Sequence, residues 1–304
     1  GDFEPIREDL IVRGFSESAY WLELPLTCSG SLAQPLYLEV AYGFLDEVAF
    51  YAVRDKRVVS QYHTGDKYPF GSRPVAARGF VFPFDCMAGA SMTLYLRTKS
   101  SESMIVPMKI WSRSAFHEKE RGENIFNGLL FGSIGFIVFF YLLYFILTRG
   151  TDFGLYAIYL LVHTLFQLSY SGLAFEYLWP DSPGWHQYSI PVLGGLVASS
   201  LLLFLFRFLR VEVHAPIFSR PFVALGFAGI LNSLVLTPIW GPQSGLVGFT
   251  LLAIVAAVTI VCACLVVGGR GFKLAYLALA AFFPLSIAMV AHGFGALGYF
   301  KLTS

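Results

Sequence analysis

Residues 125–148 read IFNGLLFGSIGFIVFFYLLYFILT, a run that contains no Asp, Glu, Lys or Arg. A helix needs roughly 20 mainly apolar residues to cross the hydrocarbon core of a bilayer, so this segment is long enough to span a membrane. Five further apolar runs follow, near residues 153–174, 189–209, 222–239, 246–267 and 274–297. Buried helices of water-soluble proteins are rarely this long, this uncharged and this consecutive. The sequence therefore predicts six transmembrane helices in contact with a lipid bilayer.

The composition agrees with a chain that lies only partly in water. Of the 304 residues, 56% are hydrophobic and 13% are charged, whereas a soluble globular domain carries about 25% charged residues. Most of the charged side chains precede Asn124, which marks the main boundary of the chain. The net charge is +1, and no basic block or Arg-rich arm is present, so no nucleic-acid partner is expected.

The placement of Lys and Arg predicts how the helices are oriented. One set of connecting segments holds the basic residues Arg149, Arg207, Arg210, Arg220, Arg270 and Lys273. The opposite segments, residues 175–188 and 240–245, hold no Lys or Arg. Because cytoplasmic loops carry an excess of these residues, the basic segments should be cytoplasmic. The part of the chain before residue 125 should then be exported.

The exported part is expected to be an all-β domain. Apolar side chains recur at a spacing of two near residues 22–26, 36–40, 48–52, 80–84, 92–96 and 104–110, with a weaker strand at 58–62. Strands with one apolar face and short turns between them are typical of an antiparallel sandwich or barrel. Cys28 and Cys86 fall at strand ends. In an oxidising compartment they could form a disulfide, and the alternative is two free thiols.

Several segments, in order along nearly the whole chain, resemble the bacterial seven-transmembrane receptors with diverse intracellular signalling modules. They are Gly14–Ser16, Ser18–Leu22, Leu45–Val48, Thr64–Asp66, Pro69–Phe70, Arg73–Pro74, Phe80–Pro83, Leu94–Arg97, Trp111–Ser112, Ala115–Phe116, Gly172–Phe175 and Tyr177–Pro180. The resemblance implies a type 2 extracellular domain, a jelly roll similar to carbohydrate-binding modules, followed by the family's seven-helix region. Members of the family usually continue into a diguanylate cyclase or a histidine kinase.

These observations together predict a multidomain membrane protein of the bacterial inner membrane. An all-β jelly-roll sandwich in the periplasm (1–115) would be followed by a juxtamembrane connector (116–124) and an all-α transmembrane bundle (125–304). The connector is charged and free of proline, so it could continue as one helix into the first span or act as a simple anchor. Because the predicted orientation puts Ser304 outside, directly after a helix, we expect a fragment without the seventh helix and the output module. We expect the full-length protein to form a homodimer.

The segment from His63 to Arg78 is the best candidate for a ligand site. It concentrates aromatic and charged side chains, namely His63, Asp66, Tyr68, Phe70, Arg73 and Arg78. Aromatic rings flanked by charged hydrogen-bonding groups suit a sugar, because a pyranose has an apolar face and a polar rim. We therefore predict that this segment binds a small periplasmic ligand, a glycan fragment. In the alternative interpretation Asp66 and Arg73 brace a long loop, while Tyr68 and Phe70 fill the end of the sandwich.

Catalytic and metal-binding signatures do not appear in the sequence. No nucleophile–base arrangement, phosphate-binding glycine loop or HExxH motif is visible, so we expect no enzyme activity from this chain and no cofactor. Asp46, Glu47 and Asp66 offer hard oxygen ligands that would suit calcium, but their spacing is not that of an EF-hand. No metal site is predicted.

Four polar side chains interrupt the predicted spans: His163, Gln167, Asn232 and His292. They would form a relay or a switch, or they would make hydrogen bonds between helices. We favour hydrogen bonding, because no charged residue accompanies them. A transporter or a membrane enzyme with an accessory sandwich would be expected to place charges in its spans, and a tethered adhesion module would need only one helix. A signal-transducing receptor is therefore the preferred interpretation.

Overall fold

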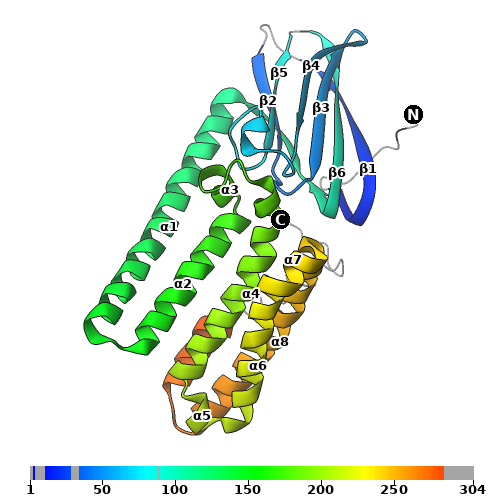
Figure 1. The fold of residues 1–304 in the computed structure, drawn as a ribbon. Coiled ribbons are helices and arrows are strands. Elements are labelled where there is room, and N and C mark those ends of the chain that lie inside the picture. The colour runs from blue at the N-terminus through cyan, green and yellow to red at the C-terminus, as the bar shows by residue number, and fades with distance from the viewer. Residues whose placement is uncertain (1–2, 4–10, 29–33, 88, 284–304) are drawn as a thin grey trace. The chain divides into compact units, whose positions relative to one another are not determined.

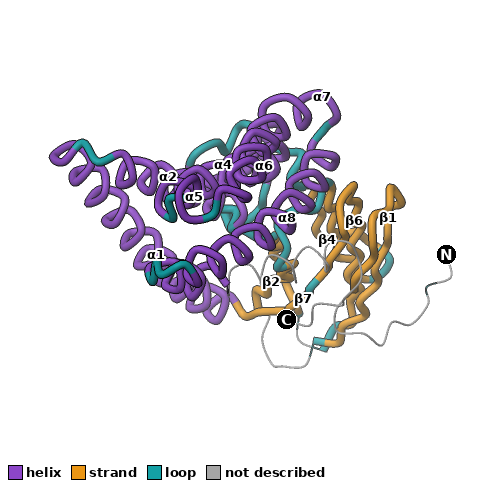
Figure 2. Tube along the Cα trace, turned by 90° about the horizontal axis from the view of Figure 1, so that it is seen from below, coloured by secondary structure: helices purple, strands orange, loops and turns teal. Residues whose placement is uncertain are grey.

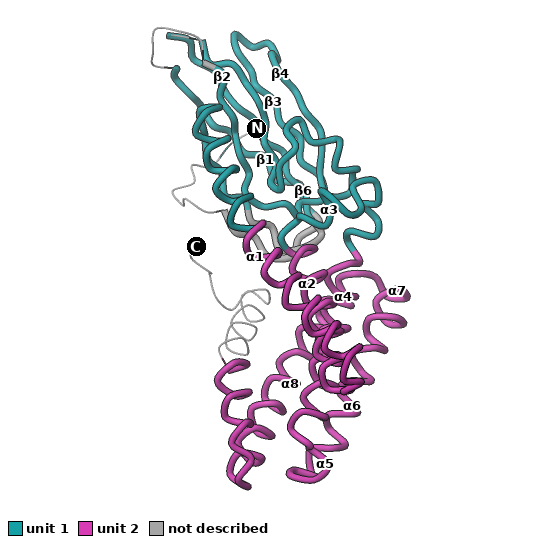
Figure 3. The backbone as a smooth tube through the Cα atoms, turned by 90° about the vertical axis from the view of Figure 1, so that its left-hand side faces the viewer, with its two compact units in different colours: residues 1–127, 171–187 teal, residues 128–170, 188–304 magenta. Residues whose placement is uncertain are grey.

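The computed structural model describes residues 3, 11–28, 34–87 and 89–283 of the chain (Figure 1). The chain divides into two compact units, shown in different colours in Figure 3. Unit 1 consists of residues 1–127 together with 171–187, and unit 2 consists of residues 128–170 and 188–304. All of the described strands belong to unit 1 (Figure 2). The second part of unit 1, residues 171–187, is a segment that connects two apolar helices.

The described part of unit 1 contains seven strands, which form two antiparallel sheets. The four-stranded sheet consists, in spatial order, of β1 (Ile11–Thr27), β6 (Ser91–Val106), β3 (Glu47–Arg54) and β4 (Arg57–Thr64). The three-stranded sheet consists of β5 (Phe80–Cys86), β2 (Gln34–Val40) and β7 (Met108–Ser112). The predicted all-β N-terminal domain is therefore confirmed.

The core of unit 1 follows from the two-residue alternation. Leu38 on β2, Phe50 on β3 and Phe82 on β5 are completely buried. The rings of Phe50 and Phe82 stack with their centroids 5.0 Å apart and their planes within 3°, so the stack joins the two sheets. Burying one such side chain contributes about 1.5–3 kcal/mol to folding. Hydrophobic contact between the inner faces therefore holds the sheets together.

The prediction of one continuous strand over residues 104–110 is wrong. Pro107 separates β6 from β7, and these two strands belong to different sheets. A proline has no N–H group to donate to a sheet ladder, and β6 has a neighbouring strand on each side, so it is not expected to continue through a proline. The carbonyl oxygen of Pro107 accepts a hydrogen bond from the backbone N–H of Ala41 at 3.0 Å. The chain changes sheets at this residue.

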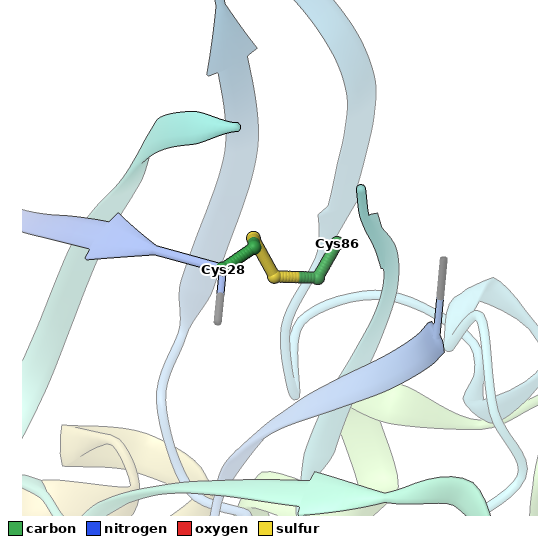
Figure 4. Close-up of a disulfide and its surroundings, with 2 residues drawn as sticks. All are labelled: Cys28 and Cys86. Atoms are coloured by element: carbon green, nitrogen blue, oxygen red, sulfur yellow. A yellow bond between two sulfur atoms is a disulfide. The ribbon is translucent and has the colours of Figure 1, made fainter. Parts of the chain in front are cut away.

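Cys28 and Cys86 are joined in a disulfide (Figure 4). Cys28 directly follows β1 and Cys86 ends β5, so the bond links the two sheets at one end. Their Cα atoms are 5.7 Å apart, within the usual range for a bridged pair. The bond closes a loop between residues separated by 58 positions.

Helix α1 (Arg113–Thr148) runs without a break through the predicted connector and the first predicted span. Its 36 residues correspond to about 54 Å at 1.5 Å per residue. The hydrocarbon core of a bilayer is only about 30 Å thick. The charged first turns are therefore not needed for spanning, and of the two alternatives for the connector the structure shows the continuous helix.

Within the described residues, five helices are long and apolar enough to cross a membrane. They are α1, α2 (Thr151–Tyr170), α4 (Pro183–Phe208), the helical stretch Pro216–Trp240 and α8 (Pro242–Gly269). The stretch Pro216–Trp240 is made of η2 (Pro216–Phe218), α6 (Ser219–Leu231), the π-helical η3 (Asn232–Leu236) and α7 (Thr237–Trp240). Two short helices, α3 (Leu173–Tyr177) and α5 (Val211–His214), lie in connecting segments. The sixth predicted span is helical over Leu274–Phe283, and the rest of it lies outside the described residues.

The second predicted span, residues 153–174, ends too late. Helix α2 stops at Tyr170, and Gly172 has a φ of +79°. Glycine adopts this left-handed conformation readily because it has no Cβ, so it is suited to ending a helix. The chain turns there and enters α3.

Small residues allow α4 and α6 to pack closely. The hydroxyl of Ser199 donates to the carbonyl oxygen of Gly226 at 2.8 Å. A Cβ placed on Gly195 would lie 2.8 Å from the carbonyl oxygen of Gly229. A side chain larger than hydrogen at Gly195 or at Gly229 would push the two helices apart. Such contacts between small residues are typical of helix pairs in membranes.

Candidate functional site

The segment that follows β4 is anchored to the residues that directly precede β3. The backbone N–H of Asp66 donates to the carbonyl oxygen of Leu45 at 2.8 Å. A Cβ at position 65 would collide with the carbonyl oxygen of Asp46, so only glycine fits there. The hydroxyl groups of Thr64 and Ser72 are 2.8 Å apart. The candidate ligand segment is thus held on the sandwich at several points.

Arg73 lies in the interior of unit 1, with 7% of its surface exposed. The central carbon of its guanidinium group is 4.7 Å from the ring centroids of both Phe70 and Phe80 and 5.7 Å from that of Phe175. Each ring presents a negative face to the cation, and such contacts strengthen when water is excluded. The three rings come from η1 (Phe70–Ser72), β5 and α3. Arg73 therefore joins the sandwich to the connecting segment 171–187 within unit 1.

Hydrogen bonds and nearby charges also fix the Arg73 guanidinium group. Its Nη1 atom donates to the carbonyl oxygens of Ala77 at 2.8 Å and Arg78 at 2.6 Å. Burial lowers the pKa of Arg73 to about 10, and the negative charges of Asp66 and Glu176 partly oppose this shift. The side chain still carries its charge near neutral pH. An internal, multiply bonded guanidinium acts here as a structural anchor.

The connecting segment 171–187 makes further contacts with the sandwich side of unit 1. The backbone N–H of Phe70 donates to the carbonyl oxygen of Pro180 at 2.8 Å. The ring of His186 stacks on Phe175 with centroids 4.1 Å apart, and on Phe44 with centroids 6.0 Å apart. His186 and Phe175 are both almost fully buried. These contacts explain why the segment belongs to the compact unit of the sandwich.

The first turns of α1 form a second connection, on the three-stranded sheet. Lys119 Nζ lies 2.5 Å from Oε1 of Glu39, a residue of β2 that is 4% exposed. The other carboxylate oxygen of Glu39 accepts from the indole N–H of Trp111 at 2.7 Å. Phe116 is buried and packs edge-to-face on Tyr37, with centroids 5.4 Å apart. The predicted connector is therefore folded onto the sandwich.

Arg78 contacts both α1 and the start of the segment 171–187. Its guanidinium group forms an ion pair with Glu123 of α1, and Lys119 lies 3.4 Å from the same carboxylate. Its backbone carbonyl oxygen accepts the hydrogen bond from Arg73. A Cβ on Gly172, at the start of the segment 171–187, would be in ordinary contact with the Arg78 side chain, 3.7 Å from its Cβ. One loop residue thus touches both parts of the chain that lead into apolar helices.

Five of the six predicted ligand residues separate into two groups, and the sixth, Arg78, is half-buried and paired with Glu123. Asp66, Phe70 and Arg73 are buried, which matches the bracing alternative more closely than direct ligand contact. His63 is exposed, and its Nε2 atom is 3.3 Å from the hydroxyl of the partly exposed Tyr68. Within these two groups, only the neighbouring side chains of His63 and Tyr68 are accessible to solvent. Ligand binding by the segment remains a prediction.

The contacts with residues 171–187 and with α1 were missed from the sequence. They join residues that are far apart in the chain, such as Glu39 and Lys119, and no local pattern marks such pairs. One weak signal was present, because Glu39 is an acidic residue within an otherwise apolar strand and Lys119 lies in the charged connector. Opposite charges alone do not identify a pair.

The predicted intramembrane polar residues have different environments. The side-chain amide of Asn232 donates to the carbonyl oxygen of Gly245 on α8 at 3.1 Å, which is the interhelical hydrogen bond expected of such a residue. Asn232 is also the first residue of the π-helical η3. Pro238 follows η3 in the chain and has no N–H group to donate to the helix ladder. On α2, His163 lies beside the ring of Tyr159, and Gln167 is exposed. His292 lies outside the described residues.

Two of the three carboxylates considered for calcium, Asp46 and Glu47, are engaged by basic side chains. Asp46 lies 2.6 Å from Lys67 Nζ, and Glu47 lies 3.0 Å from Arg97 Nη1. In the part of the chain that the structure describes, no group of three or more His, Cys, Asp and Glu side chains is arranged to hold a metal ion. The residues of the candidate site are therefore engaged in packing and in ion pairs with one another.

Comparison with known families agrees with this arrangement of a sandwich and apolar helices. Residues 1–112 match the family described as 7TMR-DISM extracellular 2, and residues 123–304 match 7TM diverse intracellular signalling. The chain belongs to the 7TM diverse intracellular signalling family. Its arrangement is that of a transmembrane receptor with an extracellular domain and a 7TM region. A search of curated proteins found no match.

Proposed function

We propose that this member of the 7TM diverse intracellular signalling family senses a small ligand in the periplasm and transmits the signal to an output module outside the chain. A diguanylate cyclase or a histidine kinase would be such a module. The ligand would be carbohydrate-like and would bind the sandwich. The protein would lie in a bacterial inner membrane, which the placement of Lys and Arg and the disulfide in unit 1 support.

The observation that carries this proposal is the construction of unit 1. Residues 113–127 of α1 and residues 171–187 fold with the sandwich, and both continue into long apolar helices. A change in the sandwich would therefore act on three helix ends at once, the start of α1, the end of α2 and the start of α4. A ligand shifts such an equilibrium only as far as its affinities for the two states differ. A flexible linker would not transmit the change in this way.

The experiment uses the full-length protein in its native cells, with cyclic di-GMP and histidine phosphorylation as the two outputs. Glu39→Lys and Lys119→Glu are compared with the double exchange, which restores opposite charges. Glu118→Lys is the control, because Glu118 is a neighbouring, exposed residue of α1.

We expect each single exchange to shift one of the outputs, the double exchange to return it toward the wild-type level, and the control to leave it unchanged. If the single exchanges leave both outputs at the wild-type level while the protein is inserted and folded, signalling through this connection is refuted.

A further inference from the structure

The outer face of the four-stranded sheet carries an aromatic platform. Alternation turns Trp21 of β1, Tyr51 of β3 and Tyr95 of β6 away from the core, whose nearest members on these strands are Leu22, Phe50 and Leu94. The rings of Trp21 and Tyr51 lie nearly parallel, with centroids 6.0 Å apart and planes at 21°. Trp21 is 48% exposed. The Trp21 ring is thus open to solvent, and the half-buried Tyr51 ring lies nearly parallel to it.

Strand register places the third ring opposite Tyr51 and diagonal to Trp21. Tyr95 is directly opposite Glu23 on one neighbouring strand and Tyr51 on the other. Cross-strand neighbours on one face are about 4.5–5.5 Å apart at Cβ. The platform therefore spans three adjacent strands, and its rings are positioned by the sheet rather than by flexible loops. The ring of Phe3 also approaches Tyr95, with the two centroids 6.2 Å apart.

Polar groups with fixed positions surround the rings. The hydroxyl of Tyr95 donates to Oε1 of Glu23 at 3.0 Å. Arg97, the cross-strand neighbour of Trp21, donates to Oε2 of Glu47 at 3.0 Å. Glu47 is in turn opposite Lys99. The carboxylates of Glu23 and Glu47 are thus balanced by the basic groups of Arg97 and Lys99. These four side chains, the rim of the platform, carry no net charge.

This combination defines the chemistry of the ligand. Near-parallel rings suit a flat apolar surface, and large aromatic side chains held in place lose little entropy when they bind. A rim without net charge favours neither an anion nor a cation. A chain of neutral pyranose rings offers apolar C–H faces for the rings and hydroxyl groups for the carboxylates and the guanidinium.

We infer that the Trp21–Tyr51–Tyr95 face is a binding site for a neutral oligosaccharide. Sugar rings would stack on Trp21 and Tyr51, while their hydroxyls donate to Glu23 and accept from Arg97. The inference rests on the proposal that the sandwich binds a ligand, and it moves the site from the buried part of the 63–78 segment to the sheet. The exposed His63 lies in the same sheet, opposite Ala49, which is opposite Arg97.

The test measures binding to the full chain in lipid nanodiscs by isothermal titration calorimetry. The probes are cellohexaose and chitohexaose, with an acidic hexasaccharide of galacturonate as the charge comparison. Trp21→Ala and Tyr51→Ala each remove one ring. Ile110→Ala is the control, because Ile110 is an apolar residue of the other sheet with a similar exposure of 42%. Thermal melting and an intact Cys28–Cys86 bond establish that each variant is folded.

We expect a neutral hexasaccharide to bind more tightly than the acidic one. Each ring deletion should weaken binding by roughly tenfold, the effect of losing one stacked ring, and Ile110→Ala should bind like the wild type. Tyr95→Phe, which keeps the ring and removes the hydroxyl, should weaken binding less than Trp21→Ala.

Three results would overturn the inference: no neutral hexasaccharide binds at millimolar concentration, binding survives both ring deletions, or the acidic probe binds more tightly. A fourth is a change in oligomeric state of Trp21→Ala in native mass spectrometry, which would assign the face to a second copy of the chain. Each leaves the receptor proposal standing, because that proposal depends on the signalling output of the Glu39 and Lys119 exchanges.

Discussion

The ammonium group of Lys119 and the buried carboxylate of Glu39 form an ion pair between residues 80 positions apart in the chain, with Nζ 2.5 Å from Oε1. Glu39 belongs to the sandwich, and Lys119 belongs to the helix that becomes the first membrane span. This pair fixes the helix to the sandwich beyond the covalent connection through β7.

Lys119→Met should destabilise unit 1 by about 1.5–3 kcal/mol, because it leaves the Glu39 carboxylate buried without its cation. Lys119 itself is partly exposed, so solvent reduces the effect. Glu39→Gln with Lys119→Met should cost less than the sum of the two single changes. Urea unfolding of the full chain in nanodiscs gives the values. Strict additivity would show that the two groups do not interact.

Arg73→Met should destabilise unit 1 by about 1.5–3 kcal/mol, since two backbone carbonyl oxygens lose a charged donor. Arg73→Lys should recover only part of the loss, because a single ammonium group cannot reproduce the planar fork of the guanidinium. Arg57→Met is the matched control, as Arg57 is exposed on β4. A stable Arg73→Ala protein that binds no ligand would instead make Arg73 a binding residue.

The disulfide should be present in protein exported to an oxidising compartment. Non-reducing peptide mapping should yield one peptide in which Cys28 and Cys86 are linked. Replacing both cysteines by serine should cost about 2–5 kcal/mol, the usual loss for a small secreted domain. Two alkylatable thiols in exported, unreduced protein would contradict the bond.

The orientation of α4 can be tested by labelling at its two ends. Cysteines introduced at Ser182 and at Arg210 should react with a membrane-impermeant reagent from opposite sides, with Ser182 reached from the periplasm. The basis is the absence of Lys and Arg around Ser182 and their presence around Arg210. Labelling of both from the same side would refute the alternating orientation of the helices.

Local patterns in the sequence predicted most elements of the fold. Alternation placed Leu22, Leu38 and Phe50 in the core, and the long apolar runs located the spans, because both patterns record directly which side chains avoid water. Errors arose where one residue overrides a pattern. Pro107 divides an apolar alternation between two sheets, and Gly172 ends a helix inside an apolar run.

The candidate site was harder to predict because it depends on distant contacts. The charged and aromatic residues around Arg73 are compatible with a ligand or with a buried anchor. Phe175, more than 100 positions later, covers Arg73 and favours the anchor. The sequence did not predict the platform residues as a site for a related reason. Trp21, Tyr51 and Tyr95 meet only through strand register, which the spacing within each strand does not reveal.

The central claim is that residues 113–124 and 171–187 belong to the same cooperative unit as the sandwich. Hydrogen exchange on the full chain in nanodiscs tests it, with the sandwich weakened by replacing Cys28 and Cys86 with serine. Segments of one cooperative unit open together. The account predicts that both segments lose protection along with β2 and β5, while α8 keeps its protection. Unchanged protection of 113–124 and 171–187 beside weakened strands would contradict it.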